Sequence, residues 1–270
     1  ISISIDKKSM QIIDFFRFPT ILASEGNLFK LKDELFKQFL EMDKHPIVNH
    51  EMLALFDSRV VKNKNQIKLI KKSNVSGNCS FAYMPTLDEI EGIEQLGIAA
   101  EIGCKAVVFH PYLQKINTDK LGIVRFLASY AEKRGMFSCI CASYGSKDIY
   151  NISPLEVVVT VAESIQAPVV IVHGGGSKVL EAFLIAEAFP NIYLDTSFSL
   201  NYWLESPLED AFAFAIRRLG ADRWMFGSDA PFRDLNKTIE SHMDFCHRYG
   251  FTNSEISSLM HGTASKLLGI

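Results

Sequence analysis

The chain has 270 residues, 48% of them hydrophobic, and a formal net charge of −3. These values predict a globular protein with a sizeable core, and the small negative charge argues against nucleic acid as a partner. The sequence contains no uninterrupted apolar stretch of the ~18 residues that a membrane helix requires. We therefore expect a small-molecule substrate, and neither nucleic acid nor a membrane as a partner.

The cysteines and the first residues bear on the cellular compartment. Five cysteines in mostly apolar surroundings predict reduced thiols rather than a disulfide framework. The first ten residues lack the basic and apolar segments of a secretion signal. Both observations favour a cytoplasmic location. The lysine-rich residues 62–72 are interpreted as a solvated helix face, with a nucleic-acid patch as the alternative.

Short apolar segments recur along the chain and predict strands that are buried on both faces. They lie at residues 10–18, 78–84, 104–110, 136–142, 168–173, 191–196 and 223–227. Segments of helical length follow the strands, at residues 86–103, 117–135, 153–166, 177–189 and 206–220. Thr86, with Glu89 three residues later, predicts a motif close to a capping box at the start of the first of these helices.

This alternation of strands and helices predicts parallel strand pairing with crossover helices. The chain length fits a (β/α)8 TIM barrel in the α/β class, as one domain over residues 1–270. Seven strands are legible, and the missing second strand would lie within residues 20–77, where residues 45–56 could contain a short strand. A distortion or helical insertion around that strand, or an open doubly wound sheet, are the alternatives.

Polar side chains follow several of the predicted strands. In a parallel barrel the functional groups gather at the carboxyl ends of the strands, so we expect His110, His173 and Asp229 to converge as catalytic residues. The structural alternatives are hydrogen-bonded core histidines and, for Asp229, a helix N-cap. The three glycines after His173 either leave room for a ligand or form a tight turn.

Further polar residues at the strand ends are candidates for substrate binding. These are Arg17, Tyr112, Ser143 and Asp195. Arg17 could bind a substrate carboxylate through two parallel hydrogen bonds, or form a salt bridge to Asp14 or Asp229. Asp195 could anchor a loop instead of contacting a substrate.

Four of these stretches and the end of the chain resemble the amidohydrolase superfamily, in particular its amidohydrolase-related (amidohydrolase 2) group. The stretches are "CKAVVFHPY" (104–112), "PVVIVHGGG" (168–176), "NIYLDTS" (191–197), "RWMFGSDAPF" (223–232) and the closing "HGTASKLLGI" (261–270). The resemblance extends from about residue 78 to the end of the chain. It implies a hydrolase that acts on a small ester, lactone or amide. Asp229 would be the base that activates water, and His173 and His110 would be metal ligands or polarising groups.

The sequence departs from the family pattern at the metal ligands. The family's first strand ends in Asp-x-His-x-His, but residues 14–18 read "DFFRF", so Phe16 and Phe18 replace the histidines. Cys141 stands at the strand-five histidine. One prediction is a divalent ion such as zinc held by His173, Asp229 and Cys141. The other is a metal-free site in which His110, His173 and Arg17 polarise a carbonyl while Asp229 activates water.

Two further functions remain as alternatives. A catalytically inactive relative could bind a small ligand or a partner subunit, because a fold survives the loss of its chemistry. The resemblance also covers decarboxylases of the same group, which share the site and differ in substrate. A homo-oligomer is compatible with each of these functions.

Overall fold

The computed structural model describes residues 10–17, 47–55 and 79–270. Its strands form one parallel eight-stranded sheet in which each strand pairs with the next along the chain. The strands are β1 (Ile13–Arg17), β2 (His50–Leu55), β3 (Cys79–Tyr83), β4 (Ala106–Phe109), β5 (Phe137–Cys141), β6 (Val169–Val172), β7 (Ile192–Asp195) and β8 (Trp224–Met225). Hydrogen bonds from Phe15 N to Phe226 O and from Asp229 N to Phe16 O, both 3.0 Å, join β1 to the segment that follows β8. The sheet is therefore a nearly closed ring.

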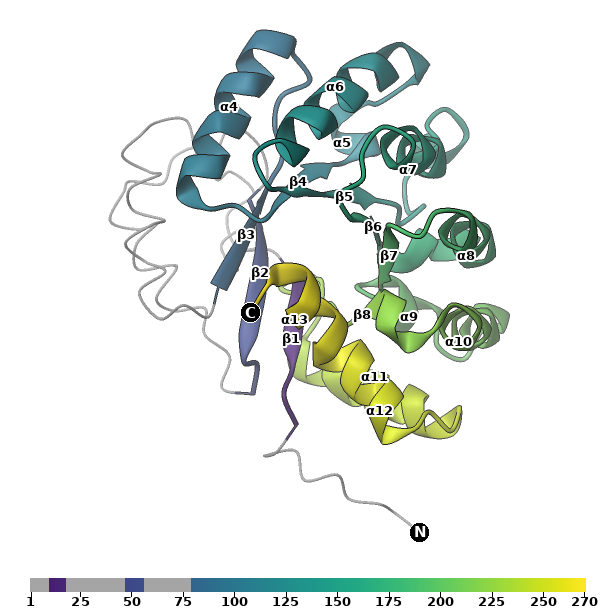
Figure 1. Ribbon diagram of the computed structural model, residues 1–270. Helices are drawn as coiled ribbons and strands as arrows, with labels where there is room; N and C mark the ends of the chain where they lie inside the picture. The colour runs from purple at the N-terminus through teal and green to yellow at the C-terminus, as the bar shows by residue number, and fades with distance from the viewer. Residues whose placement is uncertain (1–9, 18–46, 56–78) are drawn as a thin grey trace.

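Helices surround this ring and alternate with the strands after β3 (Figure 1). They are α4 (Glu89–Ile102), α5 (Pro111–Gln114), α6 (Leu121–Glu132), α7 (Pro154–Ala162), α8 (Val179–Ala188), α9 (Ser199–Trp203), α10 (Pro207–Leu219), α11 (Leu235–Arg248), α12 (Asn253–Ser257) and α13 (Thr263–Leu268). The predicted (β/α)8 barrel is confirmed, and the open doubly wound sheet is wrong.

The second strand, which the sequence left uncertain, lies inside the candidate segment 45–56. β2 spans His50–Leu55 and pairs in parallel with both β1 and β3. Residues 18–46 and 56–78 lie outside the described residues. The predictions for Phe18 and for the lysine-rich segment 62–72 therefore stay predictions.

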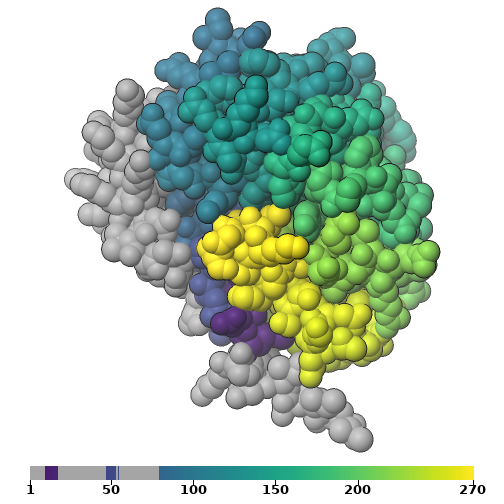
Figure 2. Space-filling model, in the orientation of Figure 1, coloured from purple at the N-terminus to yellow at the C-terminus, as the bar shows by residue number. Residues whose placement is uncertain are grey.

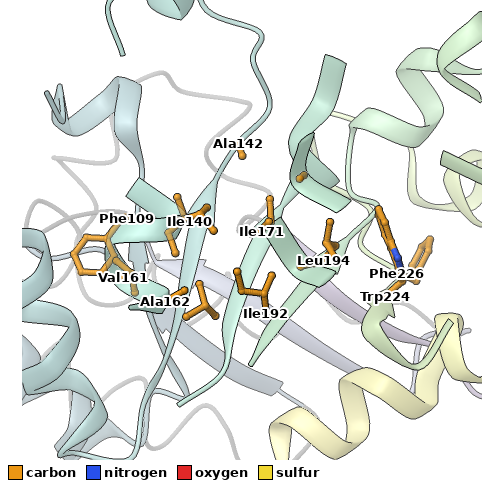
Figure 3. Close-up of a cluster of buried hydrophobic side chains, with 14 of the residues drawn as sticks. Phe109, Ile140, Ala142, Val161, Ala162, Ile171, Ile192, Leu194, Trp224 and Phe226 are labelled. Carbon is orange, nitrogen blue, oxygen red and sulfur yellow. The ribbon is translucent and has the colours of Figure 1, made fainter. Parts of the chain in front are cut away.

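Alternate residues of the strands enter two different hydrophobic clusters. On β5, Phe137, Cys139 and Cys141 belong to the cluster that fills the inside of the ring. Ile140 and the following Ala142 belong to the cluster between the strands and the surrounding helices, part of which is drawn in Figure 3. This division follows from the two-residue period of a strand, and it explains why the strand sequences are apolar at nearly every position.

The last helix closes one end of the ring. Ala264 and Leu268 of α13 pack in the interior cluster with Ile13 and Phe137, which begin β1 and β5. Figures 1 and 2 show the C-terminal segment, in yellow, lying over the centre of the molecule on this side. The amino ends of the strands are therefore covered, and the carboxyl ends, where barrel enzymes carry their chemistry, lie on the opposite side.

The helix at residues 86–103 begins two residues later than the predicted cap. Asp88 is the N-cap of α4, and its Oδ1 accepts hydrogen bonds from Ile90 N (3.0 Å) and Glu91 N (2.9 Å). Thr86 instead donates its backbone N–H to Gln95 Oε1 at 2.7 Å. The predicted cap at Thr86 was wrong because an aspartate is an equally strong N-cap and stands nearer to the apolar face.

All five cysteines are free thiols, in agreement with the prediction of reduced cysteines. In the part of the chain that the structure describes, no helix combines the length and the apolar character needed to cross a bilayer.

Candidate active site

Three of the predicted site residues follow alternate strands. His110 follows β4, His173 follows β6 and Asp229 lies shortly after β8. Side chains from alternate strands of a barrel lie in the same layer, so this placement favours a common site. Burial lowers the pKa of His110, and the charge of His173 lowers it further, so the two side chains are within electrostatic reach of each other.

Asp229 is held by backbone contacts with its side chain buried. Its φ of 59° is unusual for a residue other than glycine, and its N–H donates to Phe16 O at 3.0 Å. The residue is only 6% exposed, and its Oδ1 has no hydrogen-bond partner among the described residues. Burial raises the pKa of Asp229 to about 8, with smaller contributions from the charges of Asp195 and Asp14 and an opposing one from Arg233. A buried carboxylate with a raised pKa is a strong base when it is ionised.

Asp14 fixes the turn that carries Asp229. Its Oδ1 accepts from Ser228 N at 2.7 Å and its Oδ2 accepts from Ser228 Oγ at 2.6 Å. The Ser228 hydroxyl oxygen in turn accepts from Ala230 N at 2.9 Å. The leading acid of the first strand therefore positions the end of β8.

Replacing Asp14 by asparagine is expected to destabilise the protein by about 1–3 kcal/mol, because a neutral amide can accept only one of these two hydrogen bonds and both lose the charge of the carboxylate. Urea unfolding at pH 7 measures the change, with the exposed Asp244→Asn on α11 as control. A loss below about 0.5 kcal/mol, the range of ordinary surface substitutions, would contradict this role.

Asp195 anchors the loop after β7 and does so around His173. Its Oδ1 accepts from His173 N (2.9 Å), Ser197 N (2.9 Å) and Ser197 Oγ (2.5 Å). Its Oδ2 has no hydrogen-bond partner among the described residues, and burial raises the pKa of Asp195 to about 7. The contacts of Oδ1 therefore agree with the interpretation of Asp195 as a loop anchor. Substrate binding through Oδ2 stays a prediction.

The partners of His173 determine which ring nitrogen carries the proton. Nδ1 lies 3.0 Å from the carbonyl oxygen of Ser197, which can only accept, and the Ser197 hydroxyl donates to Asp195. Nδ1 therefore carries the hydrogen, and Nε2 has a lone pair. Burial lowers the pKa of His173 to about 4, so the ring is neutral near pH 7.

His110 has the opposite tautomer. It is the N-cap of α5, and its Nδ1 accepts from Leu113 N at 3.3 Å. Burial lowers the pKa of His110 to about 4, so the neutral ring carries its hydrogen on Nε2. One histidine thus offers a hydrogen-bond acceptor and the other a donor.

Two phenylalanines contact His173 edge to face. The Phe16 ring lies 6.1 Å from it and the Phe198 ring 6.2 Å. Phe16 is fully buried, so the position that the sequence resemblance assigns to a metal ligand holds an apolar side chain that packs against the histidine. Phe198 was not predicted from the sequence, because nothing in its local pattern indicates the positive φ of 56° that turns it toward the site.

Backbone strain concentrates at this end of the barrel. Four residues other than glycine have a positive φ in the loops that follow β5, β6, β7 and β8: Tyr144, His173, Phe198 and Asp229. Such conformations are costly and cluster at functional sites, so their position supports a site at the carboxyl ends of the strands.

The glycine run after His173 is a tight turn that passes close to other backbone. Gly176 has φ 56° and ψ −124°, and a Cβ added there would lie 2.1 Å from Ser143 O. A Cβ at Gly175 would lie 2.6 Å from the Ala182 Cβ of α8. The tight-turn interpretation is therefore confirmed for these glycines.

The other predicted binding residues have protein partners. Arg17 forms a buried ion pair with Glu51, Nη1 to Oε1 at 2.9 Å. The Tyr112 ring lies 6.4 Å from the His110 ring, and its hydroxyl has no hydrogen-bond partner within the described ranges. Ser143 contributes its backbone oxygen to the contact with the glycine turn. Their contacts with a substrate stay predictions.

The described residues do not fit a metal site with three protein ligands. No group of three His, Cys, Asp or Glu side chains within residues 10–17, 47–55 and 79–270 could hold a metal ion. Burial raises the pKa of Cys141 well above its ordinary value, so the thiol is not readily available as thiolate. With Phe16 in place of a histidine, we derive no catalytic step through a metal.

Comparisons with known proteins agree with this fold. A family model described as "Amidohydrolase" matches residues 73–270. Among curated proteins, none matches the chain by sequence. An uncharacterised TIM-barrel protein from Bordetella bronchiseptica superimposes with a TM-score of 0.74 at 18% identity, over 96% of this chain and 99% of the other.

Two similar structures carry names of enzymes. A protein described as a 2-pyrone-4,6-dicarboxylic acid hydrolase from Pseudomonas putida has a TM-score of 0.62 at 16% identity, over 96% of this chain and 97% of the other. A 5-carboxyvanillate decarboxylase from Sphingomonas paucimobilis has a TM-score of 0.64 at 13% identity, over 97% and 100%. At these identities the likeness shows the shared fold alone.

Proposed function

The chain belongs to the amidohydrolase family, and from this we propose that it is a hydrolase that cleaves a small ester or lactone by attack of water. The observation that supports the proposal most is the buried Asp229, whose Oδ1 has no hydrogen-bond partner among the described residues. Asp229, His110 and His173 are the catalytic residues of this proposal. The strand-end positions and the interaction between the two histidines support their assignment to one site.

The tautomers of the histidines suggest their roles. The Nε2–H of His110 donates a hydrogen bond to the carbonyl oxygen of the substrate and stabilises the negative charge that develops there. The Nε2 lone pair of His173 accepts one hydrogen of the attacking water and orients it. The other hydrogen of the water is directed to Asp229.

The reaction balances without another reactant. Ionised Asp229 takes a proton from water as the water oxygen forms a bond to the carbonyl carbon. The tetrahedral intermediate then collapses, and the bond to the alkoxide or enolate leaving group breaks. This leaving group takes the proton from Asp229, which restores the carboxylate. A simple amide is a poorer substrate for this site because its amine leaves much less readily.

The raised pKa of Asp229 predicts the pH dependence of hydrolysis. The base must be ionised, so kcat/KM is expected to rise with pH and to level off above an apparent pKa of about 8. The test is hydrolysis of a panel of aryl esters and lactones between pH 5 and pH 10 by protein freed of metal with a chelator. A profile that is flat above pH 6, or one that depends on added zinc or manganese, would contradict the proposed base.

Decarboxylation is the second candidate. The observation that favours it is the same pKa of about 8, because a carboxyl group that is mostly protonated at pH 7 can deliver a proton to a carbon atom. Once the carbon that bears the carboxylate is protonated, its bond to the carboxylate breaks, the electron pair of that bond returns to the substrate, and carbon dioxide leaves; Asp229 then regains a proton from water. Incubation of the protein with hydroxylated benzoates separates the two functions, because release of carbon dioxide without ester or lactone hydrolysis would favour the decarboxylase.

A further inference from the structure

Arg233 places a positive charge beside the candidate site. It lies in the connection between β8 and α11, after a turn in which Phe232 N donates to Asp229 O at 3.0 Å. Its charge opposes the rise in the pKa of Asp229, so the two side chains are within electrostatic reach. In the part of the chain that the structure describes, Arg233 has no hydrogen bond or ion pair through its side chain.

The guanidinium group of Arg233 rests on two aromatic rings. Its Cζ lies 4.6 Å from the centre of the Phe198 ring and 5.8 Å from that of Tyr202. These rings stack on each other at 5.4 Å with an angle of 17° between their planes. Stacking covers a face of the guanidinium group and leaves its N–H groups, which lie in the plane, able to bind a ligand.

The rings of Phe198 and Tyr202, which form the aromatic support of Arg233, are themselves held in place. Phe198 has a strained backbone, with φ 56° and ψ −56°, and its ring also contacts the His173 ring. Asn201 Nδ2 on α9 donates to Thr238 Oγ1 on α11 at 3.0 Å, which fixes α9 beside the helix that follows Arg233 (Figure 1). The aromatic rings thus connect the arginine with the catalytic histidine.

Arg233 is a positive charge among several acidic side chains of the candidate site. Asp14, Asp195 and Asp229 influence one another through their charges. Arg17, the arginine that the sequence predicted for the site, is already paired with Glu51 at 2.9 Å. A substrate anion would otherwise be repelled by these carboxylates, so its binding requires a cation that no protein carboxylate already holds.

We propose that Arg233 is a specificity-determining residue that binds a carboxylate of the substrate while its planar face stays on Phe198 and Tyr202. The planar guanidinium group matches a carboxylate with two parallel hydrogen bonds, which a lysine ammonium cannot reproduce. This inference rests on the proposed function and narrows it to esters or lactones that carry a carboxylate apart from the bond that is cleaved.

The proposal is tested by the hydrolysis kinetics of Arg233→Ala and Arg233→Lys. The substrates are 2-, 3- and 4-acetoxybenzoate and the methyl ester of each. We expect the wild type to hydrolyse at least one of the three acetoxybenzoates with a higher kcat/KM than its methyl ester. For that acid, Arg233→Ala is expected to lower kcat/KM by about 100-fold, mainly through KM, because one partner of a charge pair is lost. Hydrolysis of the neutral ester is expected to change by less than about threefold, since it makes no use of this charge. Arg233→Lys should recover only part of the preference.

Arg134→Ala is the matched control. Arg134 also stacks on a tyrosine, with its Cζ 5.0 Å from the Tyr130 ring, but it lies between α6 and β5 at the opposite end of the barrel. Its replacement should leave the preference for the acid unchanged. If Arg233→Ala lowers hydrolysis of the acid and the ester equally, or changes neither, the proposal is wrong.

Binding to the Asp229→Asn variant separates this inference from the proposed hydrolysis. Calorimetry measures the binding of 2-, 3- and 4-hydroxybenzoate and of their methyl esters, and it requires no turnover. Binding of an acid that weakens by about 100-fold when Arg233→Ala is added supports the carboxylate site even if no ester is hydrolysed. Failure of every acid to bind, or an equal affinity for acid and ester, overturns it.

Discussion

Asp229→Asn is expected to lower kcat/KM for the hydrolysis of esters or lactones by about 10³-fold, because an amide cannot accept the proton of the attacking water. The substitution keeps the size and shape of the side chain, and asparagine tolerates the positive φ of 59° at this position. Initial rates with the best substrate of the ester and lactone panel, measured at pH 9 where the wild-type base is ionised, give the comparison.

The stability of the Asp229→Asn variant must be measured as well, to show that a loss of activity does not come from unfolding. The pKa of Asp229 is raised in the folded protein, so the folded state holds a proton that the unfolded state releases between about pH 4 and pH 8. Its contribution to stability is therefore lost as the pH rises toward 8, and Asp229→Asn should weaken this dependence. With Asp244→Asn as control, a folded Asp229→Asn variant that keeps its activity to within about fivefold would remove Asp229 from the mechanism.

Gly176→Ala is expected to destabilise the protein by about 3 kcal/mol or more, or to prevent its folding. The backbone at Gly176, with φ 56° and ψ −124°, is in a region that residues with a Cβ rarely adopt. The new methyl group would also lie 2.1 Å from Ser143 O, so the loop after β5 or the turn after β6 must shift. Thermal and urea unfolding measure the effect.

Gly97→Ala is the matched control for this prediction. Gly97 lies in α4, and an added Cβ would meet only the Tyr130 hydroxyl at 3.9 Å. Alanine in a helix interior is expected to stabilise by about 0.5–1 kcal/mol relative to glycine. An unfolding midpoint of Gly176→Ala equal to that of the wild type would show that the turn does not require glycine.

Much of the fold follows from the order of apolar segments in the sequence. Each predicted strand is present within its predicted segment, because strands buried on both faces are apolar at almost every position. Their ends are less predictable. β8 spans only Trp224–Met225: Phe226 O still accepts from Phe15 N of β1, but Phe226 N donates to Leu259 O near the C-terminus and not to a neighbouring strand. Leu259 is remote from Phe226 in sequence, so the local pattern around Phe226 could not indicate where β8 ends.

The candidate site was less predictable from the sequence than the fold. Its main residues could be named because they follow strands directly, but their chemistry depends on partners that local sequence does not reveal. Ser197 determines the tautomer of His173, and Leu113 N determines that of His110. The pairing of Arg17 with Glu51, which lies on β2, also required the three-dimensional structure. Arg233 lies close to Asp229 in sequence, but its aromatic support became visible only in the fold.

A double-substitution cycle with Asp229→Asn and His173→Asn tests most directly whether these residues act in one catalytic site. Asparagine tolerates the positive φ of 67° at residue 173 and can still donate to Ser197 O. Residues that act as a unit show strongly non-additive effects, so kcat/KM of the double variant should fall little below that of Asp229→Asn. A double variant whose loss equals the product of the two single losses would contradict a shared site.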